Sequence, residues 1–585
     1  MAGKDSMNLI KEWKLLVRGE FATYGVGVFQ KDLLAALTVA AVALPLALAF
    51  GVASGADAAA GLVTAVVAGI LIGALGGAPY QISGPTGAMS AVLIVLASRY
   101  GMQGVWIAGL MAGIILIGLG IFRLGRVVAL IPAPVISGFT SGIALIIIFG
   151  QIDNALGIST PPAENVVGKL AYYFENGISP NVYALGLTAL VIAIMVLWPR
   201  VRFSQRVPGS LVSIIAATAI VLVAGLDVPS IGAIPRSILL DNRLNLSEVP
   251  WLEVRNLIIP AMSIAALGAI ESLLCGAVGG NMTGVRLHNS VELAAQGIGN
   301  IVIPFFGGVP ATAAIARTSV NIKSGGVTRL TSILHGVIIL LAALLFAPAI
   351  GRVPLAALAG VLMVTAWRMN EWSAIHFYFG KRLKHAMVAF LITLAATLFL
   401  DLTQAILIGF GISTLIFMSQ ISDLNISRQP VDVERLAKTG QPFTHPEHSI
   451  SVYYLSGPLF FAAARKLLDE IEAQDLPDAR VILSMRGVPL LDATGIEVLR
   501  ELWHRQQKGG GDLLLAGLQP RVENLLQRSG FLDDFAAQHV FWSADEAIRS
   551  LGAVLTPIES EPLPEDSIDS TLVIMPHEDR ALQQI

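Results

Sequence analysis

The chain has 585 residues, of which 55% are hydrophobic and only 14% are charged, and its formal net charge is -3. A soluble protein would carry about 25% charged residues, so the composition excludes an ordinary soluble protein and indicates a chain that crosses a membrane many times. The slightly acidic charge argues against nucleic acid as a partner, and a single cysteine, Cys275, excludes an intrachain disulfide framework.

Residues 1–31 precede the apolar part of the chain and are predicted to be a cytoplasmic N-terminal segment. They lack the succession of basic, apolar and small residues that marks a signal peptide. The run MNLIKEWKLLVRGEF is typical of an amphipathic segment lying on a membrane face, and a frayed tail is the alternative.

Residues 32–420 are predicted to form a transmembrane transport domain, a polytopic α-helical membrane protein. Apolar runs such as LLAALTVAAVALPLALAFG and VWIAGLMAGIILIGLGIF recur through it, and each is long enough to cross a hydrocarbon core of about 30 Å. The fourteen predicted segments are residues 33–50, 58–76, 85–98, 103–122, 132–150, 182–198, 208–224, 257–277, 288–303, 310–323, 331–349, 355–369, 384–400 and 402–420.

Two pairs of matched motifs suggest that the second half of this domain repeats the first. SGPTGAM contains Pro85 and GGVPATAA contains Pro310, 225 positions later, while LGRVVALIP and IGRVPLAAL place Gly125 and Gly351 226 positions apart. An odd number of segments in each half gives the two copies opposite orientations in the bilayer. The sequence therefore predicts a 7+7 inverted repeat, as in many secondary transporters.

The Lys and Arg residues of the loops set the predicted orientation. With the N-terminus in the cytoplasm, most basic loop residues face inward, among them Arg123, Arg200 and Lys381, and fewer face outward, such as Arg99 and Arg352. Fourteen crossings then return the C-terminus to the cytoplasm.

The stretch IPFFGGVPATAAIARTSVNIKSGG, residues 303–326, interrupts an apolar region with prolines, glycines and an arginine. Segments 310–323 and 85–98 would each be about 21 Å long as helices, which is too short to cross. We expect each helix to begin near the midplane with Pro310 or Pro85 in its first turn, after an extended segment, VIPFF or PYQIS. Opposite orientation then makes the two N-termini face each other and form an anion site. Kinked packing helices are the alternative.

Two ionisable residues lie inside predicted segments, where a charge is costly. Arg317 belongs to the second short helix, and Glu271 belongs to SIAALGAIESLLCGAVGG. We expect Arg317 to attract the anion and Glu271 to couple its entry to H⁺, or to Na⁺ held nearby. A purely structural ion pair or hydrogen bond is the alternative for each.

The composition changes near Gln420. Residues 421–449 are polar and are predicted to be a linker. Residues 450–555 alternate strand-like runs such as ARVILSM and GDLLLAG with helix-like runs such as TGIEVLRELWHRQQ, which indicates a cytoplasmic α/β domain. Residues 556–585 are acidic and carry prolines, which is typical of a disordered tail.

Several of these motifs together resemble the SulP family of anion transporters, the bacterial sulfate-permease type related to solute carrier family 26. The resemblance covers residues 31–555, and its last motif resembles a STAS domain. The motifs are ALPLALAFGVASG, ISGPTGAMSAV, GAIESLLCGAVGGNMTG, ELAAQGIGNIVIPFFGGVPATAAIARTSVNIKSGG and LLDATGIEVLRELW.

The resemblance implies a core domain and a gate domain, a homodimer, and elevator-like alternating access in a bacterial inner membrane. It also implies that Glu271 carries the coupling to protons or sodium, with no other cofactor and no metal site. The residues that it implies for anion binding are Phe50, Gly84, Pro85, Thr86, Gly87, Ala88, Ala311, Thr312, Ala313 and Arg317.

The STAS motif raises a question about Thr494. In STAS antagonists a Ser or Thr at this position can be phosphorylated, so the resemblance implies a regulatory site. The residue pattern alone favours Thr494 as the cap of a helix beginning at Gly495. We expect the domain to support dimerisation or to bind a regulatory protein.

GAIESLLC, NMTG and ATAAIAR most resemble the proton-coupled C4-dicarboxylate branch of the family, with bicarbonate and sulfate as rival substrates. A Glu at the coupling position, together with Arg317, favours protons over sodium. The alternatives are a sodium-coupled bicarbonate or sulfate symporter, a chloride-linked exchanger, a nucleobase permease, a channel or voltage-driven motor, and a regulatory receptor. The sequence has no P-loop, no metal-spaced His/Cys cluster and no nucleophile triad, so ATP-driven transport and enzymatic activity are disfavoured.

Overall fold

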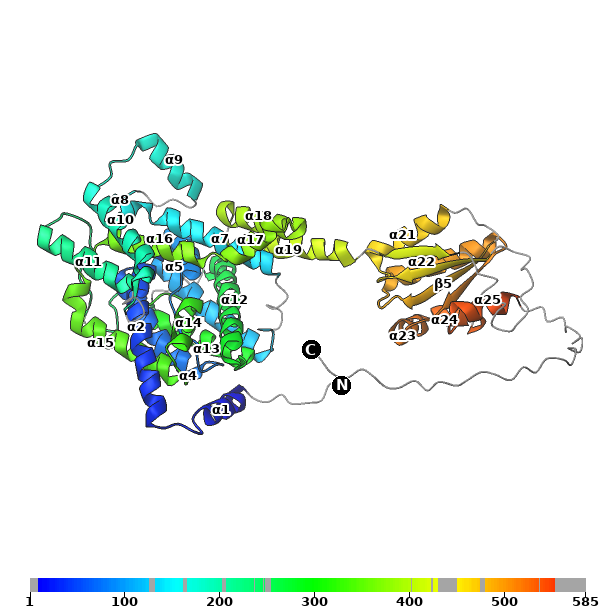
Figure 1. The fold of residues 1–585 in the computed structure, drawn as a ribbon, viewed down its shortest axis with the longest axis horizontal. Helices are drawn as coiled ribbons and strands as arrows, with labels where there is room; N and C mark the ends of the chain where they lie inside the picture. Colours follow the sequence, from blue (N-terminus) through cyan, green and yellow to red (C-terminus); the bar gives the residue numbers. More distant parts are fainter. Residues whose placement is uncertain are drawn as a thin grey trace, which may run out of the picture. The chain divides into compact units, whose positions relative to one another are not determined.

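The computed structural model describes residues 9–125, 132–160, 166–201, 207–235, 237–245, 247, 254–400, 402–421, 424–429, 450–473, 479–535 and 537–552. The chain divides into two compact units, Met1–Ile416 and Phe417–Ile585 (Figure 1). The first unit is built of helices and the second is an α/β unit. The predicted tail 556–585 and most of the predicted linker 421–449 lie outside the described residues.

The N-terminal amphipathic run forms helix α1 (Leu9–Glu20). Trp13 donates its indole N–H to the carbonyl of Ala74 at 3.1 Å. Glu20 forms an ion pair with Arg329 at 2.8 Å, and both side chains are less than a tenth exposed. The helix is therefore fixed to the rest of the helical unit by bonds from its middle and its C-terminal end, which a frayed tail would lack.

A helix lies within each of the fourteen predicted segments, and the bounds agree within a few residues for most of them. Over the described residues, seven helices are long and apolar enough to cross a membrane by length and composition. The helices that lie in the fourteen predicted segments are α2 (Val26–Ala53), α3 (Ala58–Val67) continued by η1 (Ala68–Ile72) and α4 (Gly73–Leu75), α5 (Gly87–Ile121), α7 (Ala133–Gly150), α10 (Val182–Leu197), α11 (Gly209–Ala224), α12 (Ile258–Thr283), α13 (Asn289–Val302), α14 (Ile315–Lys323), α15 (Leu330–Ile350), α16 (Leu355–Met369), α18 (Lys384–Phe399) and α19 (Leu402–Ile421).

Helix α5 covers two predicted segments, 85–98 and 103–122. Gly101 interrupts it between them with a non-helical backbone, φ 64° and ψ -177°. The structure also contains helices that the sequence did not predict. They are α8 (Ile152–Leu156), η2 (Trp198–Arg200), α9 (Val166–Asn176), η5 (Val254–Leu257), η6 (Ile303–Phe306) and α17 (Trp372–Gly380).

The helices of the first unit pack in two groups. Helices α12, α13, α14 and α15 pack against α2, α3 and α5, so the second half of the domain interleaves with the first. Helices α7, α8, α10, α11, α16 and α18 pack mainly with one another, and α16 also contacts α2. The first group contains both interrupted segments and therefore positions the candidate site.

Two short strands, β1 (Ser83–Gly84) and β2 (Thr312–Ala313), form an antiparallel ladder in which Ser83 pairs with Ala313 and Gly84 with Thr312. This ladder changes the predicted helix starts. The second short helix begins at Ile315 and not at Pro310, because the residues between them stay extended to pair with β1. Neither Pro310 nor Pro85 lies in a first helical turn, so that prediction is wrong.

The stretch VIPFF also differs from the prediction. It was expected to be extended, and it contains the short 3₁₀ helix η6 instead. The extended residues that precede α14 come after Gly307, whose φ of 85° lies in the left-handed region that glycine tolerates. Glycine, and not the proline, therefore marks the point where the chain leaves the helix.

The second unit contains a five-stranded sheet in the order β3-β4-β5-β6-β7. Strand β3 is antiparallel to β4, and the other neighbours are parallel. Strand β3 lies inside the range that was predicted to be a linker, and its register with β4 makes it part of the sheet. The strands are β3 (Asn425–Gln429), β4 (Ile450–Ser456), β5 (Arg480–Gly487), β6 (Asp512–Ala516) and β7 (Val540–Phe541).

Successive residues of a strand point to opposite faces of the sheet. Buried apolar residues therefore lie on both faces of this sheet, and helices cover each face. Val481 and Leu483 of β5 pack in the larger core, and Ile482 between them packs in the smaller one. The larger core holds α21, α22, α23 and α24, and the smaller one holds α25. These helices are α21 (Phe461–Glu472), α22 (Ala493–Lys508), α23 (Pro520–Arg528), α24 (Phe531–Phe535) and α25 (Ala544–Gly552).

Thr494 does not cap helix α22. The cap is Asp492, whose backbone is extended and whose carboxylate accepts the N–H of Gly495 at 2.9 Å. The other carboxylate oxygen accepts the N–H of Phe461 at the start of α21, at 3.1 Å. Thr494 is already the second residue of the helix, so it lies two positions after the capping residue.

Candidate functional site

The ladder of β1 and β2 places the N-termini of α5 and α14 close together. Thr86 precedes α5 by one residue and follows Gly84 by two, while Ala314 precedes α14 and directly follows β2. The strands are antiparallel, so the two helices leave the ladder in opposite directions. Each N-terminus carries unpaired N–H groups and about half a positive charge. The geometry that the sequence predicted for this pair is therefore present.

Neighbouring side chains bind the backbone of the extended segments. Thr64 accepts the N–H of Val309 at 2.8 Å and donates to its carbonyl at 3.0 Å. On the other segment, Ile82 donates its N–H to the hydroxyl of Thr318 at 3.0 Å. Non-helical backbone inside a membrane requires such internal partners, and these bonds supply them.

Helix α13 carries a polar ladder of three side chains spaced four residues apart, Glu292, Gln296 and Asn300. Glu292 accepts the N–H of Gly77 at 2.8 Å, and Gln296 donates to the hydroxyl of Ser83 at 2.8 Å. Asn300 both accepts from the N–H of Ala311 at 2.8 Å and donates to its carbonyl at 2.9 Å. One helix face therefore holds both extended segments in register.

Sequence reasoning missed this ladder. The residues stand in ELAAQGIGN, at positions i, i+4 and i+8, and such a spacing places polar side chains on one helix face. A buried polar stripe of that kind needs partners. The polar stripe could therefore have been recognised from the sequence, but the groups to which it bonds could not.

Arg317 is 1% exposed and reaches from α14 to the other segment. Its Nη2 donates to the carbonyl of Pro85 at 2.7 Å. Its Nη1 has no hydrogen-bond partner among the described residues. A buried cationic N–H without a partner beside two helix N-termini is suited to an anion.

Gly84 makes room for this arginine. A Cβ atom at this position would lie 2.5 Å from Nη1 of Arg317, and the φ of 157° disfavours other residues. Gly84 and Arg317, which are 233 positions apart in the sequence and were both predicted to belong to the anion site, therefore lie in direct contact.

Glu271 of α12 accepts a hydrogen bond from the hydroxyl of Thr86, with 2.9 Å between Oε2 and Oγ1. The Thr86 oxygen also accepts the N–H of Met89 at 3.3 Å, as the cap of α5. Ser272, the next residue of α12, lies 2.9 Å from the hydroxyl of Thr312. Helix α12 therefore contacts both extended segments, and its carboxylate reaches the end of α5.

Phe50 of α2 lies beside the start of α5. A Cβ atom on Gly87 would meet Ile147 at 2.8 Å, Met369 at 3.1 Å and Phe50 at 3.2 Å. Ile147 belongs to α7 and Met369 to α16, the second group of helices. Sequence reasoning did not single out these two apolar residues, since nothing in their own neighbourhood distinguishes them.

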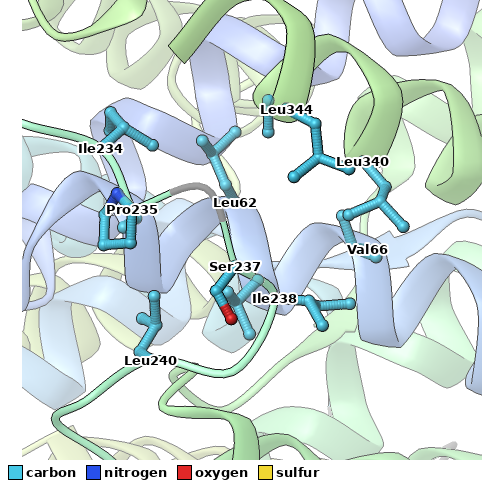
Figure 2. A pocket seen from close by; sticks show the side chains of 12 residues that line it. Leu62, Val66, Ile234, Pro235, Ser237, Ile238, Leu240, Leu340 and Leu344 are labelled. Carbon is cyan, nitrogen blue, oxygen red and sulfur yellow. The ribbon is translucent and has the colours of Figure 1, made fainter. Parts of the chain in front are cut away.

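The pocket in Figure 2 lies elsewhere. Its lining comes from α3, from α15 and from the segment around residues 234–240, and Leu62, Val66 and Leu340 are among the side chains that point into it. Among the lining residues that the structure describes, Ser237 is the single polar one. It contains none of the predicted site residues, and its apolar wall does not suit an anion.

The structure brings together the predicted site residues of the helical unit. Over the described residues, no group of three or more His, Cys, Asp or Glu side chains is arranged to hold a metal ion. The residues that surround the two helix N-termini are Phe50, Gly84, Pro85, Thr86, Gly87, Ala88, Glu271, Ala311, Thr312, Ala313 and Arg317.

Comparison with known families agrees with this architecture. The chain matches the model of the sulfate permease family over residues 29–396 and that of the STAS domain over residues 444–547. It is 37% identical to the putative sulfate transporter YvdB of Bacillus subtilis, covering 90% of this chain and 99% of that protein. It is 29% identical to the bicarbonate transporter BicA of Synechocystis sp., covering 92% and 97%.

Two solved structures are similar. The murine Slc26a9 anion transporter in its inward-facing state superimposes with a TM-score of 0.81 over 94% of this chain and 96% of that one, at 19% identity, which shows the shared fold. The transmembrane domain of a cyanobacterial bicarbonate transporter, BicA, gives a TM-score of 0.59 at 30% identity, over 67% of this chain and 98% of that domain.

Proposed function

Because the chain belongs to the sulfate permease family of membrane transporters, which are not enzymes, and carries a STAS domain, we propose that it is a secondary active symporter of a small anion. The observation that carries the proposal is the buried Nη1 of Arg317 beside two helix N-termini, which has no hydrogen-bond partner in the described part of the chain. The anion would bind there, between Gly84–Ala88 and Ala311–Ala313.

The coupling of anion binding to protons follows from the balance of charges at the proposed site. The two helix ends supply about one positive charge together, Arg317 adds one, and ionised Glu271 subtracts one. Arg317 and Glu271 interact electrostatically. At about 6 Å and an effective dielectric constant near 20, one charge pair is worth roughly 3 kcal/mol, or about a hundredfold in affinity. A proton on Glu271 therefore favours anion binding, so affinity should rise as the pH falls.

Alternating access would use the two groups of helices. We assign the group that holds the site as the core domain and the group with α7 and α16 as the gate domain. The apolar contact of Ile147 and Met369 with Gly87 would be the sliding surface of an elevator-like movement. Apolar contacts without directional bonds suit sliding, because no hydrogen bond must break.

The wider assignments follow the same proposal. They include fourteen membrane crossings in a 7+7 inverted repeat, a bacterial inner-membrane location with both termini in the cytoplasm, and a homodimer. The STAS domain would support the dimer or bind a regulatory protein, and Thr494 would be its phosphorylation site. Fumarate or another C4-dicarboxylate is the first candidate substrate, followed by bicarbonate and sulfate.

The test uses the purified chain in liposomes, with labelled fumarate, bicarbonate, sulfate and chloride in separate arms. A pH gradient and a Na⁺ gradient are imposed separately. We expect uptake of one of the first three anions, driven by a proton gradient, and we expect Glu271→Gln to bind the anion without pH dependence. Uptake driven by Na⁺ alone would favour the sodium-coupled alternative, and uptake only in exchange for chloride would favour the exchanger. Unchanged gradient-dependent uptake by Glu271→Gln would contradict the coupling assignment.

A further inference from the structure

The hydrogen bond between Thr86 and Glu271 connects the N-terminus of α5, which borders the proposed anion site, with the carboxylate that is proposed to couple transport to protons. Thr86 is 7% exposed and caps the N-terminus of α5, the end that follows strand β1. Glu271 lies on α12 and is only partly buried. Their 2.9 Å bond is the direct contact between the proposed coupling carboxylate and a helix end of the anion site.

The hydroxyl of Thr86 has one hydrogen and two lone pairs. One lone pair accepts the N–H of Met89. An ionised carboxylate can only accept, so while Glu271 is ionised the Thr86 hydrogen must point at it. A protonated carboxyl group can donate, and the second lone pair of Thr86 can accept from it. The Thr86 hydrogen is then free to turn to another acceptor.

An acceptor at the anion site would lie within reach of that hydrogen. Arg317 donates to the carbonyl of Pro85, the residue directly before Thr86. Its Nη1, which has no hydrogen-bond partner within the described ranges, lies against Gly84, two residues before Thr86. An anion held by Nη1 would therefore lie beside the Thr86 hydroxyl.

We propose that Thr86 is a hydrogen-bond switch, which donates to Glu271 while that carboxylate is ionised and to the bound anion once Glu271 carries a proton. The inference rests on the proposed function, because it assigns part of the coupling to one hydroxyl. The proton comes from solution and stays on Glu271, where one O–H bond forms. The Thr86 proton changes its partner without leaving its oxygen.

The other titratable groups around Glu271 do not replace this contact. Arg317 on α14 stays protonated. On α12 itself the thiol of Cys275 donates to Thr318 at 3.2 Å, and on α13 the carboxylate of Glu292 is bonded to Gly77 and Gln296. Strand β2 carries no titratable side chain. The remaining groups on packed elements are Lys323 at the end of α14, Arg99 and Tyr100 near the interruption of α5, and Arg255 in η5 before α12.

The test measures anion affinity at about pH 5.5 and about pH 8.5, on either side of neutrality, where sulfate keeps its charge. The probes are labelled sulfate and labelled fumarate, in separate arms, with the full chain in liposomes. The variants are Thr86→Val, which is close in shape and lacks the hydroxyl, Thr86→Ser, which keeps it, and Glu271→Gln. The Gln amide can donate to Thr86 as a protonated carboxyl would.

We expect Thr86→Val to lower affinity about tenfold or more at the acidic pH, the size of one hydrogen bond to a charged group, and to have little effect at the alkaline pH. Thr86→Ser should keep most of the difference between the two pH values. In the Glu271→Gln background, Thr86→Val should cost the same factor at both pH values.

An equal loss at both pH values in the otherwise unmodified chain would overturn the switch, because it would show a constant contact. The result is separable from a failure of the proposed function. If the unmodified chain shows no pH dependence, the coupling proposal fails, whereas pH dependence that survives in full in Thr86→Val removes only the switch. Thermal unfolding of each variant checks folding, and Thr86→Ala replaces Thr86→Val if the latter does not fold, with the same expected pattern.

Discussion

The segment that leads into α5 and the segment that leads into α14 pair with each other, yet their helix ends differ. The end of α5 has a side-chain cap, Thr86, which also bonds to Glu271. The end of α14 has Ala314 at the cap position and no side-chain cap, but it carries Arg317 two residues into the helix. Two segments with the same succession of strand and helix can therefore differ in the chemistry of their helix ends.

This difference in capping indicates which helix N-terminus is available to bind an anion. A capped N-terminus has already satisfied one of its N–H groups, and the Thr86 cap is further engaged by a carboxylate. The uncapped N-terminus with a cation beside it is the more attractive of the two. We infer that α14 supplies most of the attraction and that α5 supplies the link to Glu271.

The largest expected effect comes from Arg317→Ala, which removes the cation from the second segment. We expect anion affinity to fall about a hundredfold, the value of one charge pair at about 6 Å. Arg317→Lys is the matched control, because it keeps the charge and loses the planar donor fork. Binding measured by titration calorimetry on purified protein checks this, and an affinity unchanged in Arg317→Ala would show that α14 does not dominate the site.

A smaller effect is expected from the polar ladder of α13, where Asn300→Leu and Gln296→Leu form a matched pair. Asn300→Leu leaves both backbone groups of Ala311 without their partner, at about 1–3 kcal/mol for each. Gln296→Leu removes the bonds to the side-chain hydroxyl of Ser83 in β1 and to the carboxylate of Glu292, which keeps the N–H of Gly77 as a partner. Asn300→Leu should lower the thermal transition and the anion affinity more than Gln296→Leu does. The reverse order would mean that β1, and not β2, needs the stronger support.

The smallest expected effect is that of Gly87→Ala, at the start of α5. The added methyl group meets two flexible side chains, Ile147 and Met369, which can shift, and the ring of Phe50 at 3.2 Å. We expect a loss of a few fold in transport rate that exceeds the loss in affinity, because Ile147 and Met369 belong to the group of helices that would slide past the site, while Gly87 and Phe50 border the proposed anion. Initial rates and equilibrium binding measured on the same liposomes separate the two. A larger change in affinity than in rate would place Gly87 in the binding contact itself.

Sequence reasoning found the helices of the first unit because long apolar runs need no partner to be recognised. It placed the interruptions near Pro85 and Pro310 but assigned the helix starts to the prolines themselves. The starts are at Gly87 and Ile315 because the two segments pair as strands first, and that pairing joins residues more than 200 positions apart. In the second unit it missed β3, whose polar sequence carries no strand pattern and which is held by its neighbour β4.

The sequence by itself determined the class of protein, the position of its apolar segments, and the presence of Arg317 and Glu271 where charges are costly. These properties depend on composition and local spacing. Only the tertiary structure decided that Arg317 donates to Pro85, that Thr86 donates to Glu271, and that one face of α13 holds both strands. Each is a contact between distant segments, and its geometry is set by how the helices pack.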